Sequence, residues 1–336
     1  MTTIVILLLG FLFGAILSYA NLNKYNVISG MAMLKDLTVA KAILTTIGVG
    51  AILLMIEIQL GWAAYHVKPF IAVGIGLGGL IFGTGMAILG YCPGTMAVSI
   101  GEGSLDAVIG MVGGLIGGWV FTILYPSIHN LLDPDWGKVS VASLINNNTL
   151  FIILVVVIGA LLILSAFILD QKSDRKNRKW LYAGIALAAL NSIVFLKGVE
   201  NRPIGASTAY PYLSDSMVCA TGNEYFGKIK TPGNWEAVFL IGALLAGLVI
   251  ALIRKEFKFK MIHSNWEKYR GGSKINRIVW AFIGGFVLIF GARMAGGCTS
   301  GHVLSGGMQL AISSLVFAAF VFAGLVLTGK YFYREK

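Results

Sequence analysis

The chain has 336 residues, of which 57% are hydrophobic and only 12% are charged. A soluble domain of this size has about a quarter of its residues charged, so the composition excludes a soluble protein and predicts an all-α integral membrane protein. The net charge of +11 does not indicate nucleic-acid binding, because the basic residues gather in short loops beside apolar runs, as they do in cytoplasmic membrane loops.

Nine apolar runs are each long enough to cross about 30 Å of hydrocarbon. The first has no preceding Lys or Arg, which favours a membrane span over a signal peptide, and the 43 glycines suit helices that pack closely in lipid. The predicted transmembrane helices are approximately residues 3–20, 39–62, 69–90, 104–125, 149–169, 180–198, 234–253, 276–296 and 307–329.

Two basic connections set the predicted orientation. The connection after the fifth span contains Lys172, Arg175, Lys176, Arg178 and Lys179, and residues 254–277 contain eight more basic residues. Positively charged loops stay in the cytoplasm. We therefore expect the N-terminus outside and the C-terminus, with Lys330, Arg334 and Lys336, in the cytoplasm.

Two of the apolar runs break at a cysteine with the same neighbours. Phe-Gly and then Met-Ala precede both Cys92, at the end of the third span, and Cys298, at the end of the eighth. Five spans separate the two, so the copies run through the membrane in opposite directions, as in the inverted repeats of transporters. The predicted units are residues 1–148 (first half), 149–179 (linker span and basic loop) and 180–336 (second half).

Two further segments, residues 21–36 and 203–221, follow the first span of each half and are too short to cross the membrane. One interpretation makes them re-entrant helices or loops that meet near the midplane, where irregular backbone is tolerated if protein buries it. The other places them as loops on the lipid surface.

The residues around each cysteine predict an anion site. Pro93 disfavours helical geometry at Cys92 and suits the first position of a new helix. The free N–H groups of Gly94 and Thr95 would then lie beside the thiol at a helix N-terminus, which attracts anions.

After Cys298, Thr299 or Ser300 is a candidate helix cap, and Gly301 allows a ligand to approach the backbone closely. A free thiol titrates near 8.5, so its neutral S–H group can donate to an anionic sulfur without repelling it. The alternative is that each cysteine is simply a small buried hydrophobic residue.

Other polar residues have two interpretations each. Arg293, which is costly inside a membrane, either neutralises the transported anion or pairs with Glu57. His302 either relays protons or is a satisfied interfacial side chain. Cys219 is either incidental or an accessible thiol at the pore mouth. Asn191 predicts a bond between helices, while Glu102 and Asp106 suit the N-terminus of the fourth span and have no predicted transport role.

No spacing of the three cysteines matches a zinc site, and phosphate-loop, H-E-x-x-H and nucleophile-elbow motifs are absent from the sequence. We therefore expect no metal, no cofactor and no enzymatic activity.

At the two cysteine motifs, residues 83–95 and 290–302, the chain resembles the YeeE/YedE family of bacterial inner-membrane proteins, also called the sulfur transport family. Residues 205–208 and 232–236 add to the likeness. The resemblance implies an hourglass of pseudo-symmetric halves in which Cys92 and Cys298 relay thiosulfate through S–H to sulfur hydrogen bonds. Family members often have a further cysteine after the first span, but residues 19–26 contain none here.

The leading hypothesis is therefore import of thiosulfate or a similar small sulfur anion, with sulfite and selenium compounds still open. A second hypothesis is a sulfurtransferase-like membrane protein that carries sulfane sulfur as a cysteine persulfide. A third is a non-transporting partner of a cytoplasmic sulfurtransferase, which would bind the basic loops. The sequence leaves the driving ion and the oligomeric state open.

Overall fold

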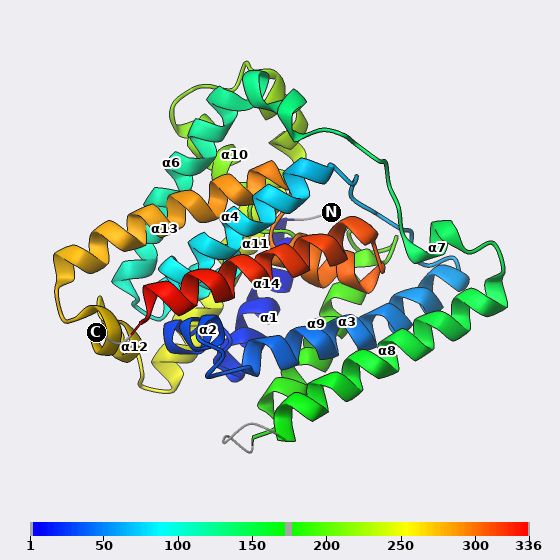
Figure 1. The fold of residues 1–336 in the computed structure, drawn as a ribbon, viewed down its shortest axis with the longest axis horizontal. Coiled ribbons are helices and arrows are strands. Elements are labelled where there is room, and N and C mark those ends of the chain that lie inside the picture. The colour runs from blue at the N-terminus through cyan, green and yellow to red at the C-terminus, as the bar shows by residue number, and fades with distance from the viewer. Residues whose placement is uncertain (1–2, 172–176, 335–336) are drawn as a thin grey trace.

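The computed structural model describes residues 3–171 and 177–334 (Figure 1). Helices form the regular structure of these residues, and four isolated β-bridges join loops. The all-α prediction is therefore confirmed. Lys172, Arg175, Lys176 and Lys336, which contributed to the predicted orientation, lie outside the described residues.

Seven helical segments in the described chain are long and apolar enough to cross a membrane. The nine predicted runs all fall on helices, but two of these helices, α1 (Thr3–Tyr19) and α9 (Lys179–Phe195), have 17 residues each and are shorter than the other seven. The longer segments are α3 (Thr38–Gln59), α4 (Ala72–Leu89) together with α5 (Pro93–Gly101), α6 (Leu105–Ile128), α8 (Asn148–Gln171), α11 (Glu224–Ile253), α13 (Lys274–Met294) and α14 (Ile312–Phe332).

Glycines allow the central helices to approach closely. Helix α4 packs between α13 and α14, and the three lie side by side in Figure 1. A Cβ atom on Gly85 would stand 2.4 Å from the backbone nitrogen of Leu288, and one on Gly291 would stand 2.5 Å from that of Phe82. Only glycine fits these crossings, as expected for helices that associate in lipid.

The remaining packing joins early and late parts of the chain. Helix α1 packs on α11 and α9 on α3, α5 packs on α11, and a π-helix, η2 (Thr299–Gly306), packs on α3 and α14. Helix α8 packs on the outside of α3 and buries few of its residues. The short helices are α2 (Tyr25–Ala32), η1 (His129–Leu132), α7 (Val141–Leu144), α10 (Ala209–Met217) and α12 (Ser264–Arg270).

Helices α2 and α10 form the two short segments that the sequence left undecided. Seven of the eight residues of α2 are buried, against α14, α12, α3 and α4, so α2 does not lie on a lipid surface. Helix α10 packs on α6 and α11 and is partly buried, because Tyr210 points inward while Met217 is exposed. Protein contacts therefore hold both segments in place.

Candidate functional site

The break at Cys92 has the geometry that Pro93 predicts. Helix α4 ends at Leu89, and the next residue, Gly90, has a φ of +79°, in the left-handed region that commonly follows a helix. Cys92 is the N-cap of α5 and Pro93 its first residue. The backbone N–H of Cys92 donates to the Thr95 hydroxyl over 2.8 Å, and that hydroxyl lies 3.3 Å from the Cys92 sulfur. The thiol is thus held at the start of a new helix.

The break at Cys298 is similar, but its cap differs from the prediction. Helix α13 ends at Met294, and Cys298 itself is the N-cap of η2, because its backbone is extended (φ −126°, ψ −170°) and the helix begins at Thr299. The prediction that Thr299 or Ser300 is the cap was therefore wrong. Ser300 contacts the thiol instead, with its Oγ 3.2 Å from the Cys298 sulfur.

Both breaks meet at a cavity of about 60 Å³, which we call the apolar cavity. Its polar lining comes from the two cysteine motifs, and the rest of its wall consists of large apolar side chains. From the motifs come Cys92, Gly94, Thr95, Thr299 and Ser300, and the apolar wall is formed by Phe13, Leu17, Leu22, Ile28, Val39, Ala42, Ile43, Met86, Leu187 and Leu304.

A second cavity of about 300 Å³, which we call the basic pocket, lies against the next residue of the same turn. Gly301 lines it, whereas Thr299 and Ser300 line the apolar cavity, so the first turn of η2 separates the two. Its charged lining consists of Lys68, Arg202, Lys228, Arg293 and one carboxylate, Glu236. A cleft with such an excess of positive charge concentrates anions.

Arg293 supplies a buried cation to the basic pocket. It is 7% exposed, and its guanidinium donates to the Tyr225 hydroxyl over 2.6 Å and to the Thr208 hydroxyl over 3.1 Å. These partners are neutral. The alternative that Arg293 pairs with Glu57 is wrong, because Glu57 accepts a hydrogen bond from Ser192 instead.

Lys68 is a second cation of the basic pocket, which the sequence analysis did not single out. Its Nζ donates to the Gly296 carbonyl and lies where a side chain on Gly297 would clash, 2.2 Å from that glycine's ideal Cβ position. Burial, together with Arg293, lowers the pKa of Lys68 to about 8. Three cations of this pocket are in connections that were predicted to be external, where the positive-inside rule does not expect them: Lys68, Arg202 and Lys228. This exception is the sequence signal that could have identified them as functional residues.

Tyr210 links the two breaks. It is 1% exposed, its hydroxyl donates to the Pro93 carbonyl over 3.2 Å, and it lies within electrostatic range of both Cys92 and Cys298. Tyr210 therefore joins α10 to the first turn of α5, within electrostatic range of both thiols.

Two more predicted residues lie in η2 or in contact with it. Both ring nitrogens of His302 have partners, the Ala295 carbonyl at 2.8 Å and the Ser314 hydroxyl at 3.0 Å, which favours a satisfied side chain over a proton relay. Asn191 accepts a hydrogen bond from Ser305 of η2, as its place in a membrane helix predicted.

Cys219 and the two acidic residues at the start of the fourth span line neither cavity. Cys219 is exposed and lines neither cavity. Glu102 bonds to Lys24, and Asp106, in the first turn of α6, forms a buried ion pair with Arg277.

Comparison with known proteins identifies similar chains. A family model described as "Sulphur transport" matches residues 19–327. The chain is also 27% identical, over 335 residues and 95% of each chain, to a protein described as "Thiosulfate transporter TsuA" from Spirochaeta thermophila.

Proposed function

The chain belongs to the sulphur transport family, and from this membership we propose that it imports thiosulfate, or a closely similar small sulfur anion, across the bacterial inner membrane. The family membership and the similar transporter make it a multi-pass membrane transporter of sulfur anions and not an enzyme. The identity of the anion and the role of the two thiols are the proposed parts.

The observation that carries the proposal is the meeting of the two cysteine motifs at one cavity beside the basic pocket. A doubly charged anion is first attracted by Lys68, Arg202 and Arg293. It then passes the first turn of η2, where Cys298 and next Cys92 present S–H groups to its terminal sulfur. The helix starts at Pro93 and Thr299 add positive partial charge along this route.

We further propose that residues 1–148 and 180–336 are inverted halves joined by residues 149–179. The packing supports this, because four of the contacts between the halves have counterparts. Helix α1 on α11 matches α9 on α3, α4 on α14 matches α13 on α6, α5 on α11 matches η2 on α3, and α2 on α14 matches α10 on α6. Helices α1 and α9 then cross the membrane despite their length, which gives nine spans.

The proposed orientation places the basic pocket outside and residues 254–274 in the cytoplasm, with the N-terminus outside and the C-terminus inside. The basic residues in that connection support it. A cytoplasmic sulfurtransferase that binds this basic face stays a prediction.

The persulfide-carrier alternative is less well supported by the contacts of the thiols. A carrier cysteine needs activation by a base or a cation in contact with it. The side chains that hydrogen-bond to Cys92 and Cys298 in the described chain are the hydroxyls of Thr95 and Ser300. Such contacts orient a neutral thiol, which suits a relay better than covalent chemistry.

The test is uptake of ³⁵S-thiosulfate by bacterial cells that lack other import routes. We expect Cys92→Ser and Cys298→Ser to reduce uptake to background, because a hydroxyl is a poorer partner for a soft sulfur anion than a thiol. Cys219→Ser is the matched control and should keep most activity. Full uptake by either of the first two variants would refute the thiol relay, and competition by excess sulfite or sulfate measures the selectivity.

A further inference from the structure

The carbonyl end of α4 lacks its normal backbone donors. In a continuous helix the carbonyls of Ile88 and Leu89 would accept from the backbone N–H groups of residues 92 and 93. Pro93 has no N–H, and the N–H of Cys92 donates to Thr95 instead. Buried carbonyls without a donor are costly, so the break that creates the Cys92 site requires donors from elsewhere.

Arg277 of α13 supplies these donors. Its two terminal nitrogens donate to the carbonyls of Ile88 over 3.2 Å and Leu89 over 2.7 Å. The Tyr333 hydroxyl donates to the preceding carbonyl, that of Ala87, over 2.8 Å. Three successive carbonyls at the end of α4 are therefore capped by side chains from the last sixty residues of the chain. From its place in the sequence Arg277 belongs to the basic connection, but it is completely buried.

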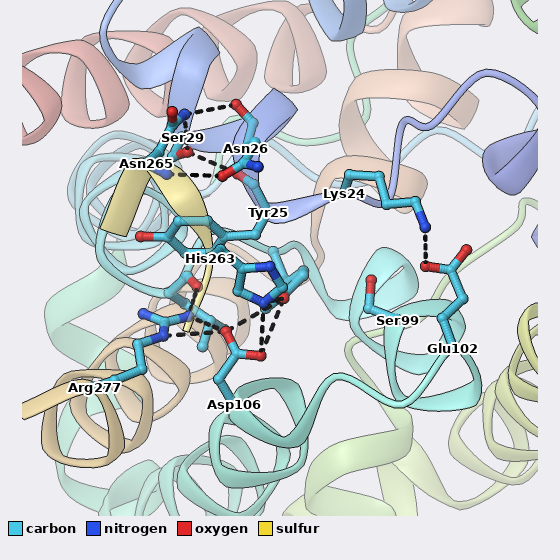
Figure 2. Close-up of polar contacts among 12 residues, drawn as sticks. Lys24, Tyr25, Asn26, Ser29, Ser99, Glu102, Asp106, His263, Asn265 and Arg277 are labelled. Carbon is cyan, nitrogen blue, oxygen red and sulfur yellow. Dashed lines mark hydrogen bonds and ion pairs between the residues drawn. The ribbon is translucent and has the colours of Figure 1, made fainter. Parts of the chain in front are cut away.

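Asp106 holds the guanidinium in place (Figure 2). The Arg277 Nε donates to the Asp106 carboxylate over 3.1 Å, and both side chains are completely buried. The Tyr91 hydroxyl lies 3.2 Å from the same carboxylate and 3.0 Å from the Nε2 of His263, which itself contacts Asp106. Because Tyr91 directly precedes Cys92, these hydrogen bonds also hold the backbone next to the Cys92 thiol.

Aromatic rings enclose the guanidinium and exclude water. Its central carbon lies 4.6 Å from the ring centre of Tyr25 and 4.7 Å from that of Trp266. A lysine could keep the positive charge here, but its single ammonium group cannot reproduce the planar fork that serves two carbonyls and one carboxylate together.

We propose that Arg277 and Asp106 are positioning residues for Cys92: as a buried pair they cap the broken end of α4 and hold the thiol at the cavity. The pair does not touch the transported anion. The proposal depends on the proposed function only where uptake is measured.

The test follows the reactivity of Cys92 as the single thiol, in a Cys219→Ser, Cys298→Ser background, toward N-ethylmaleimide. Arg277→Lys should raise the alkylation rate about tenfold, a change equivalent to losing one good hydrogen bond. The double variant Asp106→Asn with Arg277→Met removes both charges and should raise it at least as much. Arg270→Lys, a cation on nearby α12 that contacts rings but not α4, is the matched control and should leave the rate unchanged.

Uptake is measured with the same substitutions in the wild-type background, and size-exclusion chromatography measures the folded amount. A pair that serves only to neutralise charge would let the neutral double variant recover both alkylation rate and uptake, and that recovery would overturn the proposal. If an Arg277 variant does not fold, the Tyr91→Phe variant is tested in its place. This substitution removes one hydroxyl of the network and keeps the shape of the side chain. A wild-type alkylation rate in folded Tyr91→Phe would also overturn the proposal.

The two proposals fail separately. The alkylation rate reports where Cys92 stands whether or not the protein carries thiosulfate. Full uptake by Cys92→Ser would end the relay mechanism while leaving the altered alkylation of Arg277→Lys as evidence for positioning.

Discussion

The basic pocket and the apolar cavity lie on opposite sides of one helical turn, yet they have opposite chemistry. Lys68, Arg202 and Arg293 line the first, whereas the wall of the second, apart from the cysteine motifs, is formed by side chains such as Leu22 and Ile43. Charge on one side can capture an anion, but a strongly charged site along the whole path would also retain it. Conduction requires binding that is strong enough for entry and weak enough for release.

The basic pocket and the apolar cavity should control different steps of transport. The basic pocket should determine the apparent affinity for the anion, because its cations meet the anion first. The apolar cavity should determine the transport rate and selectivity, because only the Cys92 thiol, three hydroxyls and the helix starts offer polar contacts there. Variants on each side should therefore change different kinetic constants.

The largest expected effect is on the apparent affinity for the anion, from a substitution in the basic pocket. Arg293→Gln should raise the apparent KM for thiosulfate about ten- to hundredfold, since a hydrogen bond to a charged group contributes about 1.5–3 kcal/mol. Arg293→Lys should lose less, because the charge remains. Lys255→Gln, which changes an exposed cation that does not line the pocket, is the control. An unchanged KM in Arg293→Gln would show that the pocket does not receive the anion.

Lys68 allows the same comparison to be tested by pH. With a pKa lowered to about 8, its positive charge is present below pH 8 and is lost as the pH rises through that value. Apparent affinity should therefore fall between pH 7 and pH 9, by about tenfold at most. Lys68→Arg keeps its charge and should flatten this profile. The nearby Arg293, Arg202, Glu236 and Cys298 are common to both proteins, so the difference between the two profiles isolates Lys68. Identical profiles would contradict the prediction.

The smallest expected effect is on the transport rate, from a substitution in the apolar cavity. Leu22 lines the apolar cavity just after α1, near the place where family members often have a further cysteine. Leu22→Cys should raise the maximal uptake rate a few-fold, because a third thiol shortens the apolar part of the path. Leu22→Ala, which opens similar space without a sulfur, is the matched control. Equal rates in the two variants would show that space, and not the thiol, limits transport.

Much of this could be predicted from the sequence, because apolar runs and helix breakers act locally. The apolar runs all fall on helices, seven of them in segments long enough to cross a membrane, and Pro93 predicted that a new helix begins there with Cys92 just before it. The repeated motif around Cys92 and Cys298 also predicted that two breaks share one environment, and residues from both motifs line the apolar cavity.

Only the tertiary structure decided which distant side chains meet at those breaks. The distance between two residues across helices depends on packing, which local patterns do not record. Arg293 therefore pairs with hydroxyls and not with Glu57, and Arg277, which reads as a loop cation, is buried against Asp106. A break in a membrane helix leaves backbone carbonyls without hydrogen-bond donors. The sequence shows where such a break occurs, but only the tertiary structure shows which side chains supply the donors.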